Sequence, residues 1–465
     1  MFTFLVCPEY DELARDIVQW TIGRTTNIIE LDHYNCHELS FTTAMNSLHL
    51  TGALVGVLFA AYPSCPAADA PAAAPWKVGT PIATYWAGPP MTDATAAQMA
   101  EGGFNLVWCT EKELDVAQRH GLRGQLTDGL LSPTTLEDSA QREKLDALIA
   151  RVRHHPALYD YFITDEPSAT NFSALGKLVA YLRERDPAHL AYINLFPTYA
   201  SNDQLGTKGD TVTAYHEHLR QFVDVVKPGL LSYDHYQFSV KGDNDGYFLN
   251  LAMIRRAAQD AGLPFLNIVQ AATWSPSMRV PTGDEVRFLD YTTLAYGAQG
   301  ISYYVYCCAG HTGAVAHADG TVTPLYYTLK TLNREFVSIA QQLQPLCSLG
   351  VYHAGMLPQG TEPVPANGRF QLDPPVPAMS YTNLQPVKGV LLGYFGPAGK
   401  GKRAPTPTHV MVVNLDYQAE AVVGIRGPSR LELFDPAMGR WSRAPGKRAD
   451  LRLPRGGGCL VRVRR

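Results

Sequence analysis

The run Tyr161-Phe162-Ile163-Thr164-Asp165-Glu166-Pro167 is the strongest structural signal in this sequence. Its apolar residues predict a short buried strand, and two adjacent carboxylates follow before a proline. Pro167 disfavours a helical backbone at the preceding residue, so we expect the strand to end here. Carboxylates beside a buried strand cost free energy unless they are hydrogen-bonded or used, so Asp165 and Glu166 are candidate functional residues.

Comparable apolar runs recur between residues 81 and 308, and they alternate with segments such as 139–153 and 284–296 whose apolar residues repeat at helical spacing. This alternation is typical of βα units around a parallel sheet. A count of eight strands predicts an α/β fold of the (β/α)8 TIM barrel type, with a doubly wound open sheet as the alternative. The predicted strands are Ile82–Ala87, Phe104–Cys109, Leu122–Leu126, Tyr159–Thr164, Ala191–Phe196, Leu230–Tyr236, Phe265–Ala271 and Gly300–Cys307.

The sequence changes character after about residue 348, where Pro and Gly become frequent and helical periodicity fades. Short alternating runs predict a small C-terminal antiparallel β-sandwich. We therefore expect a leader at 1–75, a barrel at 76–347 and the sandwich at 348–465. The predicted sandwich strands are Gly389–Phe395, His409–Leu415, Ala421–Ile425, Arg430–Phe434 and Cys459–Val463.

The leader contains an apolar stretch, Leu50–Tyr62, which is too short for a membrane span but suits the centre of a signal peptide. An Ala-Asp-Ala tripeptide at 68–70 and a Pro/Ala-rich spacer follow it. We expect export, to the periplasm or outside the cell, with either Met1 or Met45 as the initiator. The alternative is an ordinary N-terminal pair of helices.

The composition excludes several classes of function. The chain has 465 residues, 46% hydrophobic and 18% charged, with a formal net charge of −4, so we expect no nucleic-acid partner. Its eight cysteines lack the paired C-x-x-C spacing of a structural zinc site, and no metal is expected.

Active sites of (β/α)8 barrels lie at the carboxyl ends of the strands. Crowding of Asp165 and Glu166 there raises the pKa of one carboxyl group, which suits a general acid. Other strand ends supply aromatic rings, amides and an acid that suit a hexose, although any single ring is as well explained by packing. The candidate substrate-binding residues are Trp86, Trp108, Asn194, Tyr233, Asp234, His235, Tyr236, Gln270, Trp274 and Tyr304.

The Asp-Glu-Pro run on the fourth strand, Tyr192-Ile193-Asn194-Leu195 on the fifth and Thr293–Ala298 before the eighth resemble TIM-barrel glycoside hydrolases across about residues 80–345. Ordinary retaining members place a second Glu at the end of strand seven. Here that strand reads Asn267-Ile268-Val269-Gln270-Ala271-Ala272-Thr273-Trp274 and has no carboxylate.

An adjacent Asp-Glu pair without a strand-seven nucleophile is similar to the substrate-assisted β-N-acetylhexosaminidases, and above all to the β-N-acetylgalactosaminidases of glycoside hydrolase family 123. The resemblance implies exo-acting release of a terminal β-linked N-acetylhexosamine, N-acetylgalactosamine favoured, through an oxazolinium intermediate. Glu166 would be the acid/base, and Asp165 would orient the acetamido group. Tyr233 or Tyr236 would hold its oxygen, with Trp274 or Trp86 as the wall behind its methyl group.

Two other functions stay open. One is a two-carboxylate exo-glycosidase resembling family 42 β-galactosidases, with Glu166 as acid and Asp234 as second carboxylate. The other is a carbohydrate-binding barrel without catalysis, which the intact Asp165-Glu166 pair disfavours. Each glycosidase reading expects a glycan or glycoconjugate substrate and no cofactor.

Overall fold

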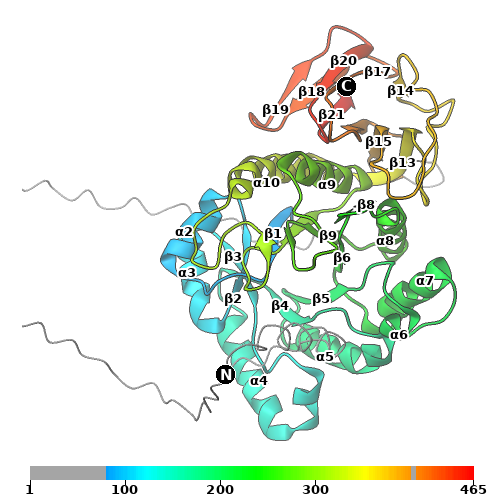
Figure 1. The fold of residues 1–465 in the computed structure, drawn as a ribbon. Coiled ribbons are helices and arrows are strands. Elements are labelled where there is room, and N and C mark those ends of the chain that lie inside the picture. Colours follow the sequence, from blue (N-terminus) through cyan, green and yellow to red (C-terminus); the bar gives the residue numbers. More distant parts are fainter. Residues whose placement is uncertain (1–79, 400–404, 465) are drawn as a thin grey trace, which may run out of the picture. The chain divides into compact units, whose positions relative to one another are not determined.

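The computed structural model describes residues 80–399 and 405–464 (Figure 1). The predicted leader at 1–75, with its signal peptide, lies outside the described residues, so export stays a prediction. None of the helices in the described ranges is long and apolar enough to cross a membrane.

Eight parallel strands form one sheet in the order β1-β11-β9-β6-β5-β4-β3-β2. Hydrogen bonds through Asn105 join its two ends, because the Asn105 backbone donates to Ala83 O and the Ala83 backbone donates to Asn105 Oδ1, both at 3.0 Å. The prediction of a TIM barrel is therefore confirmed. The strands are β1 (Ile82–Trp86), β2 (Leu106–Cys109), β3 (Arg123–Leu126), β4 (Leu158–Thr164), β5 (Leu190–Leu195), β6 (Leu231–His235), β9 (Phe265–Gln270) and β11 (Gly300–Tyr304).

A helix follows each barrel strand, and Figure 1 shows these helices around the strands. Their buried faces carry apolar residues at helical spacing, as in Leu145, Leu148, Ile149 and Val152 of α4 (Ser139–Val152). The helices are α2 (Asp93–Glu101), α3 (Leu114–Arg119), α4 (Ser139–Val152), α5 (Phe172–Arg185), α7 (Thr211–Gln221), α8 (Tyr247–Ala261), α9 (Gly283–Tyr296) and α10 (Pro324–Leu343).

Side chains alternate between the two faces of each barrel strand. Ile82, Leu106, Tyr192, Leu266 and Ile268 belong to one apolar cluster inside the barrel. Their sequence neighbours pack instead in the larger cluster shared with the helices. This alternation determines which residues at a strand end reach the barrel interior.

The C-terminal part is a β-sandwich, as predicted. All five predicted strands form. Four further strands were not predicted, namely β13 (Cys347–Gly355), β14 (Gln371–Leu372), β19 (Arg440–Arg443) and β20 (Arg448–Leu453). One sheet contains β13 (Cys347–Gly355), β15 (Gly389–Gly396), β16 (His409–Asn414), β21 (Gly458–Val463), β18 (Leu431–Asp435) and β19 (Arg440–Arg443) in that order. The other contains β14 (Gln371–Leu372), β17 (Ala421–Arg426) and β20 (Arg448–Leu453).

The sandwich packs closely against α9 of the barrel. A Cβ atom at Gly393 on β15 would lie 2.2 Å from the Ala295 carbonyl oxygen, so only glycine allows this approach. The Tyr417 hydroxyl donates a hydrogen bond of 2.9 Å to Asp243, which follows the loop after β6. These contacts hold the sandwich on the barrel.

Candidate active site

Asp165 and Glu166 lie directly after β4, as the sequence predicts. Glu166 has a φ of +42°, a conformation that is uncommon outside glycine and that recurs at active sites. Its backbone N–H donates a hydrogen bond of 2.9 Å to the carbonyl oxygen of Asn194, the residue before the last of β5. The neighbouring strand thus fixes the position of Glu166.

The Asn194 amide connects two carboxyl groups. Its Nδ2 donates to Asp165 Oδ1 at 3.0 Å and to Asp234 Oδ1 at 2.9 Å. Its Oδ1 accepts a hydrogen bond of 3.0 Å from the Ser232 hydroxyl, which lies 2.7 Å from the Tyr192 hydroxyl. These bonds fix the orientation of the amide, with its donors toward the acids.

Asp234 on β6 is buried, with 2% of its surface exposed, and is hydrogen-bonded to the Glu166 side chain. Loss of hydration raises the pKa of Asp234 to about 7, and the charge of Asp165 adds to the shift. Ionised carboxylates only accept hydrogen bonds, so the bond between Glu166 and Asp234 requires a proton on one of them. The two groups therefore share a proton.

Asp165 differs from Asp234 in its access to solvent. It keeps an exposed surface, although the protein atoms around it displace water and raise the pKa of its carboxyl group to about 6. The hydrogen bond from Asn194 opposes this shift. Asp165 is therefore the carboxylate of the pair joined by Asn194 that a ligand can reach.

Three aromatic rings pack against one another near these acids. The ring centroids of Tyr236 and Trp274 are 4.7 Å apart, those of Tyr236 and Tyr304 5.0 Å, and those of Trp274 and Tyr304 4.8 Å. The Tyr304 hydroxyl lies 3.1 Å from Nε2 of His311. Burial raises the pKa of Tyr304, and the charges of Cys308 and then of Asp165, Asp234 and Glu166 add to the shift.

Trp86 and Trp108 form a second aromatic group with Phe162 at the ends of β1, β2 and β4. The centroid of Trp108 lies 5.0 Å from Trp86 and 4.8 Å from Phe162. All three rings are half-buried; Trp86 and Phe162 pack on the cluster inside the barrel, and Trp108 packs on the larger cluster shared with the helices. Phe162 also approaches Tyr192, with ring centroids 6.1 Å apart.

The structure does not bring three predicted residues into this arrangement. Tyr233 and His235 alternate with Asp234 on β6 and are fully buried on the helix side, where His235 Nδ1 lies 3.0 Å from Asn250 of α8. Gln270 faces the interior, but its amide bonds to the backbone of Phe238 and Arg279 use both of its donor hydrogens and its oxygen. Gln270 therefore joins the loop after β6 to the loop after β9.

Ser232, Tyr192 and His311 were not predicted as site residues from the sequence. The first two share the interior face with Asp234 and Asn194, so strict alternation along β5 and β6 would have found them. His311 lies in the loop after β11, where no periodicity indicates its direction. No group of three His, Cys, Asp or Glu side chains within residues 80–399 and 405–464 is arranged to hold a metal ion.

The β9 strand and the residues after it, up to Trp274, contain no carboxylate. The three acids described above instead come from the ends of β4 and β6. A second carboxylate therefore does not face Glu166 from β9.

The sequence matches no protein-family model and no curated protein. Among solved structures, a β-galactosidase from the psychrophilic Marinomonas ef1 is 12% identical with a TM-score of 0.42, and the match covers 59% of this chain and 63% of that one. A putative α-L-fucosidase from Bacteroides thetaiotaomicron is 12% identical with a TM-score of 0.38, over 60% of this chain and 100% of that one. The catalytic domain of a mannanase from Streptomyces sp. SirexAA-E is 16% identical with a TM-score of 0.36, over 54% and 82%. These are distant similarities to glycoside hydrolases.

Proposed function

We propose that this protein is an exo-acting glycoside hydrolase that releases a terminal β-linked N-acetylhexosamine, N-acetylgalactosamine favoured, by substrate-assisted retaining catalysis. The observation that carries the proposal is the placement of the acids: Asp165, Glu166 and Asp234 are joined by hydrogen bonds, and β9 contributes none. An acid/base is present without a nucleophile on β9. The substrate's acetamido oxygen can take the role of that nucleophile.

Glu166 is the proposed general acid and base. The proton shared with Asp234 keeps a protonated carboxyl group available near neutral pH, as protonation of the leaving oxygen requires. As the glycosidic bond breaks, the acetamido oxygen bonds to the anomeric carbon and forms an oxazolinium ion. Glu166, now ionised, then takes a proton from the water that opens this ring and releases the sugar with its anomeric configuration retained.

Asp165 is the proposed partner of the acetamido N–H. It is accessible, and Asn194 holds one of its oxygens, which leaves the other to accept from the substrate. A carboxylate in this position orients the acetamido oxygen toward the anomeric carbon and stabilises the positive charge of the intermediate.

The rings of Tyr236, Trp274 and Tyr304 are the proposed wall for the sugar. Stacked aromatic faces suit the apolar face of a hexose and the methyl group of an acetamide. Tyr236 is the better of the two tyrosines considered for the acetamido oxygen, because Tyr233 lies on the helix side of β6.

The two-carboxylate alternative is less well supported. Retaining enzymes of that type hold their carboxyl groups about 5 Å apart, on either side of the anomeric carbon. Glu166 and Asp234 are joined by a side-chain hydrogen bond, which does not fit two separate carboxyl groups on opposite sides of a sugar carbon. An inactive carbohydrate-binding barrel would have no need for a proton shared by Glu166 and Asp234 beside the accessible Asp165.

Hydrolysis of paired aryl β-glycosides tests the proposal. We expect turnover of the N-acetylgalactosaminide and N-acetylglucosaminide, with the first faster, and inhibition by a thiazoline mimic of the intermediate. Turnover of the plain galactoside, insensitive to the thiazoline, would favour the Glu166 and Asp234 mechanism instead. No turnover of any member by a folded protein would favour the binding function.

A further inference from the structure

We propose that the C-terminal sandwich contains a second saccharide site, which binds an acidic glycan through its carboxylate or sulfate groups. A hollow of about 720 Å³ lies there, within the size range of small-ligand sites. Its charged and polar lining includes Arg369, His409, Glu432, Arg443, Arg462 and Arg464.

The strand register brings four of these residues into one row. Arg462 on β21 faces His409 on β16 and Glu432 on β18, and Glu432 in turn faces Arg443 on β19. Directly facing residues of antiparallel strands lie on the same side of a sheet. The row therefore follows from the fold and does not depend on the conformations of long side chains.

The single acid in the hollow is already paired. Glu432, with 14% of its side chain exposed, accepts from Arg462 at 2.8 Å, and Arg464 lies 3.9 Å away. The Arg462 guanidinium also lies 4.0 Å from the centroid of the Trp441 ring. Arg462 is thus held in place by two contacts, which lowers the entropic cost of binding a ligand.

Arg369 and Arg443 are left for a ligand. Both are exposed, and neither has an ion-pair or side-chain hydrogen-bond partner within the part of the chain that the structure describes. Four arginines against one glutamate leave three uncompensated positive charges, in a chain whose net charge is −4. Guanidinium groups pair bidentately with carboxylate and similar oxyanions, so the excess charge fits an anionic ligand.

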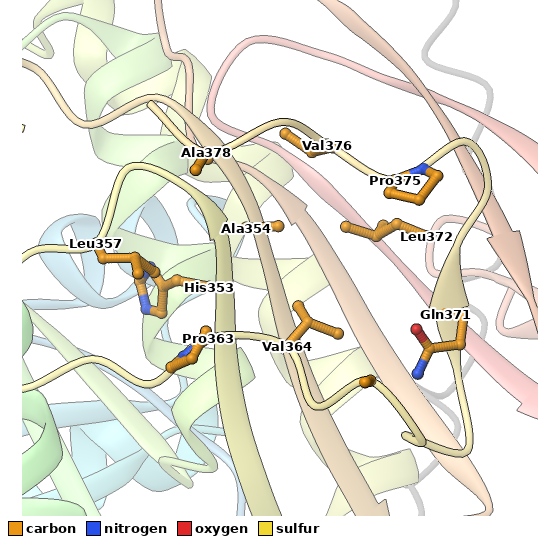
Figure 2. Close-up of a pocket in the computed structure, with 12 residues that line it drawn as sticks. His353, Ala354, Leu357, Pro363, Val364, Gln371, Leu372, Pro375, Val376 and Ala378 are labelled. Carbon is orange, nitrogen blue, oxygen red and sulfur yellow. The ribbon is translucent and has the colours of Figure 1, made fainter. Parts of the chain in front are cut away.

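Another hollow in the same domain has a different character. A cavity of about 430 Å³ lies beside β13. Figure 2 shows mostly apolar residues such as Leu372 and Val376 around it. The Gln371 amide nitrogen there donates to the carbonyl oxygens of Pro365 and Gly368. The excess of positive charge thus belongs to the arginine-lined hollow.

The saccharide class rests on the proposed function of the barrel, whereas the anionic character rests on the arginines. A site on the sandwich would hold an acidic chain while the barrel removes its terminal sugar.

Calorimetric titration of the full chain tests this inference without using hydrolysis. The probes are a chondroitin sulfate tetrasaccharide, a neutral chitin tetrasaccharide and inorganic sulfate, with the Glu166→Gln variant to prevent turnover. We expect binding of the sulfated tetrasaccharide, at least tenfold weaker in Arg369→Gln/Arg443→Gln. The control Arg440→Gln/Arg452→Gln removes the same charge from exposed positions outside the hollow and should bind as tightly as the parent.

Equal weakening by both double variants would overturn the site, because general charge would then explain the binding. If the neutral tetrasaccharide binds as tightly as the sulfated one, the site does not recognise negative charge. If inorganic sulfate binds as tightly as the sulfated tetrasaccharide, the site does not recognise a saccharide. These titrations test binding to the sandwich even if the barrel hydrolyses no glycoside. Failure of the proposed hydrolase function and failure of the proposed sandwich site can therefore be distinguished.

Discussion

The Asn194 side-chain amide donates a hydrogen bond of 3.0 Å to Asp165, and the same nitrogen lies 2.9 Å from Asp234. One amide therefore sets the spacing between an accessible carboxylate and a buried one that shares a proton with Glu166. The following predictions separate the roles of these four residues.

Glu166→Gln should lower turnover of aryl N-acetylhexosaminides by about 10²–10⁴-fold, because the amide cannot protonate the leaving oxygen. The substitution keeps the shape of the side chain, so the thermal unfolding midpoint should stay close to that of the parent. Steady-state kinetics and thermal unfolding provide the two measurements. Parent-like activity would show that Glu166 is not the acid.

Asp165→Asn should lower kcat on N-acetylated substrates on the order of 10²-fold, because the neutral amide cannot stabilise the positive charge of the oxazolinium ion. KM should change less than kcat, since the transition state loses more than the bound substrate does. If kcat on the N-acetylgalactosaminide is unaffected, the acetamido-orienting role is wrong.

Asn194→Ala should lower kcat about 10–100-fold, because Asp165 and Asp234 lose the donor that positions them. Loss of this donor also raises both pKa values, so the pH–rate profile should move to higher pH. Asn267→Ala is a matched control, since Asn267 is equally buried on β9 but bonds to Thr293 of α9. A loss of stability with an unchanged pH profile in Asn194→Ala would indicate a purely structural role.

Asp234→Asn should stabilise the fold at high pH. In the parent the pKa of Asp234 is raised from its ordinary value near 4 to about 7, so the folded state binds a proton that the unfolded state releases between these values. Parental stability therefore falls as pH rises from about 4 to 7 and stays lowered above that. The variant lacks this pH-dependent loss of stability, and its side-chain amide can still donate a hydrogen bond to Glu166 and accept one from Asn194. The measurement is the thermal unfolding midpoint of parent and variant at pH 4 and pH 8. If the midpoint of the variant relative to the parent does not rise from pH 4 to pH 8, burial does not raise the pKa of Asp234 as described.

Much of the fold could be predicted because the barrel strands are apolar runs separated by helical periodicity. All eight barrel strands begin and end within about three residues of the predicted positions, as at β9, predicted as Phe265–Ala271 and observed as Phe265–Gln270. In the sandwich, β20 (Arg448–Leu453) and β13 were missed. β20 alternates Arg and Asp with small and apolar residues, and Gly350 interrupts β13, so neither forms an apolar run.

The candidate site could be predicted only in part. Asp165, Glu166, Asn194 and Asp234 are brought together because they end neighbouring strands on the interior face. Tyr233 and His235 were selected with Asp234 although the two-residue period of a strand turns them to the other face. The bonds from Gln270 to Phe238 in the loop after β6 and to Arg279 in the loop after β9 depend on long-range folding that no local pattern encodes.

The most direct test of substrate assistance is the effect of fluorine on the acetamido group. In a series of aryl β-N-acylgalactosaminides from acetyl to trifluoroacetyl, each fluorine weakens the nucleophilicity of the amide oxygen without changing the leaving group. If that oxygen attacks the anomeric carbon, kcat/KM must fall steeply along the series, by orders of magnitude in total, in the parent enzyme. A kcat/KM that is independent of fluorination would show that the acetamido group takes no part in the reaction, and would contradict the mechanism built on Asp165 and Glu166.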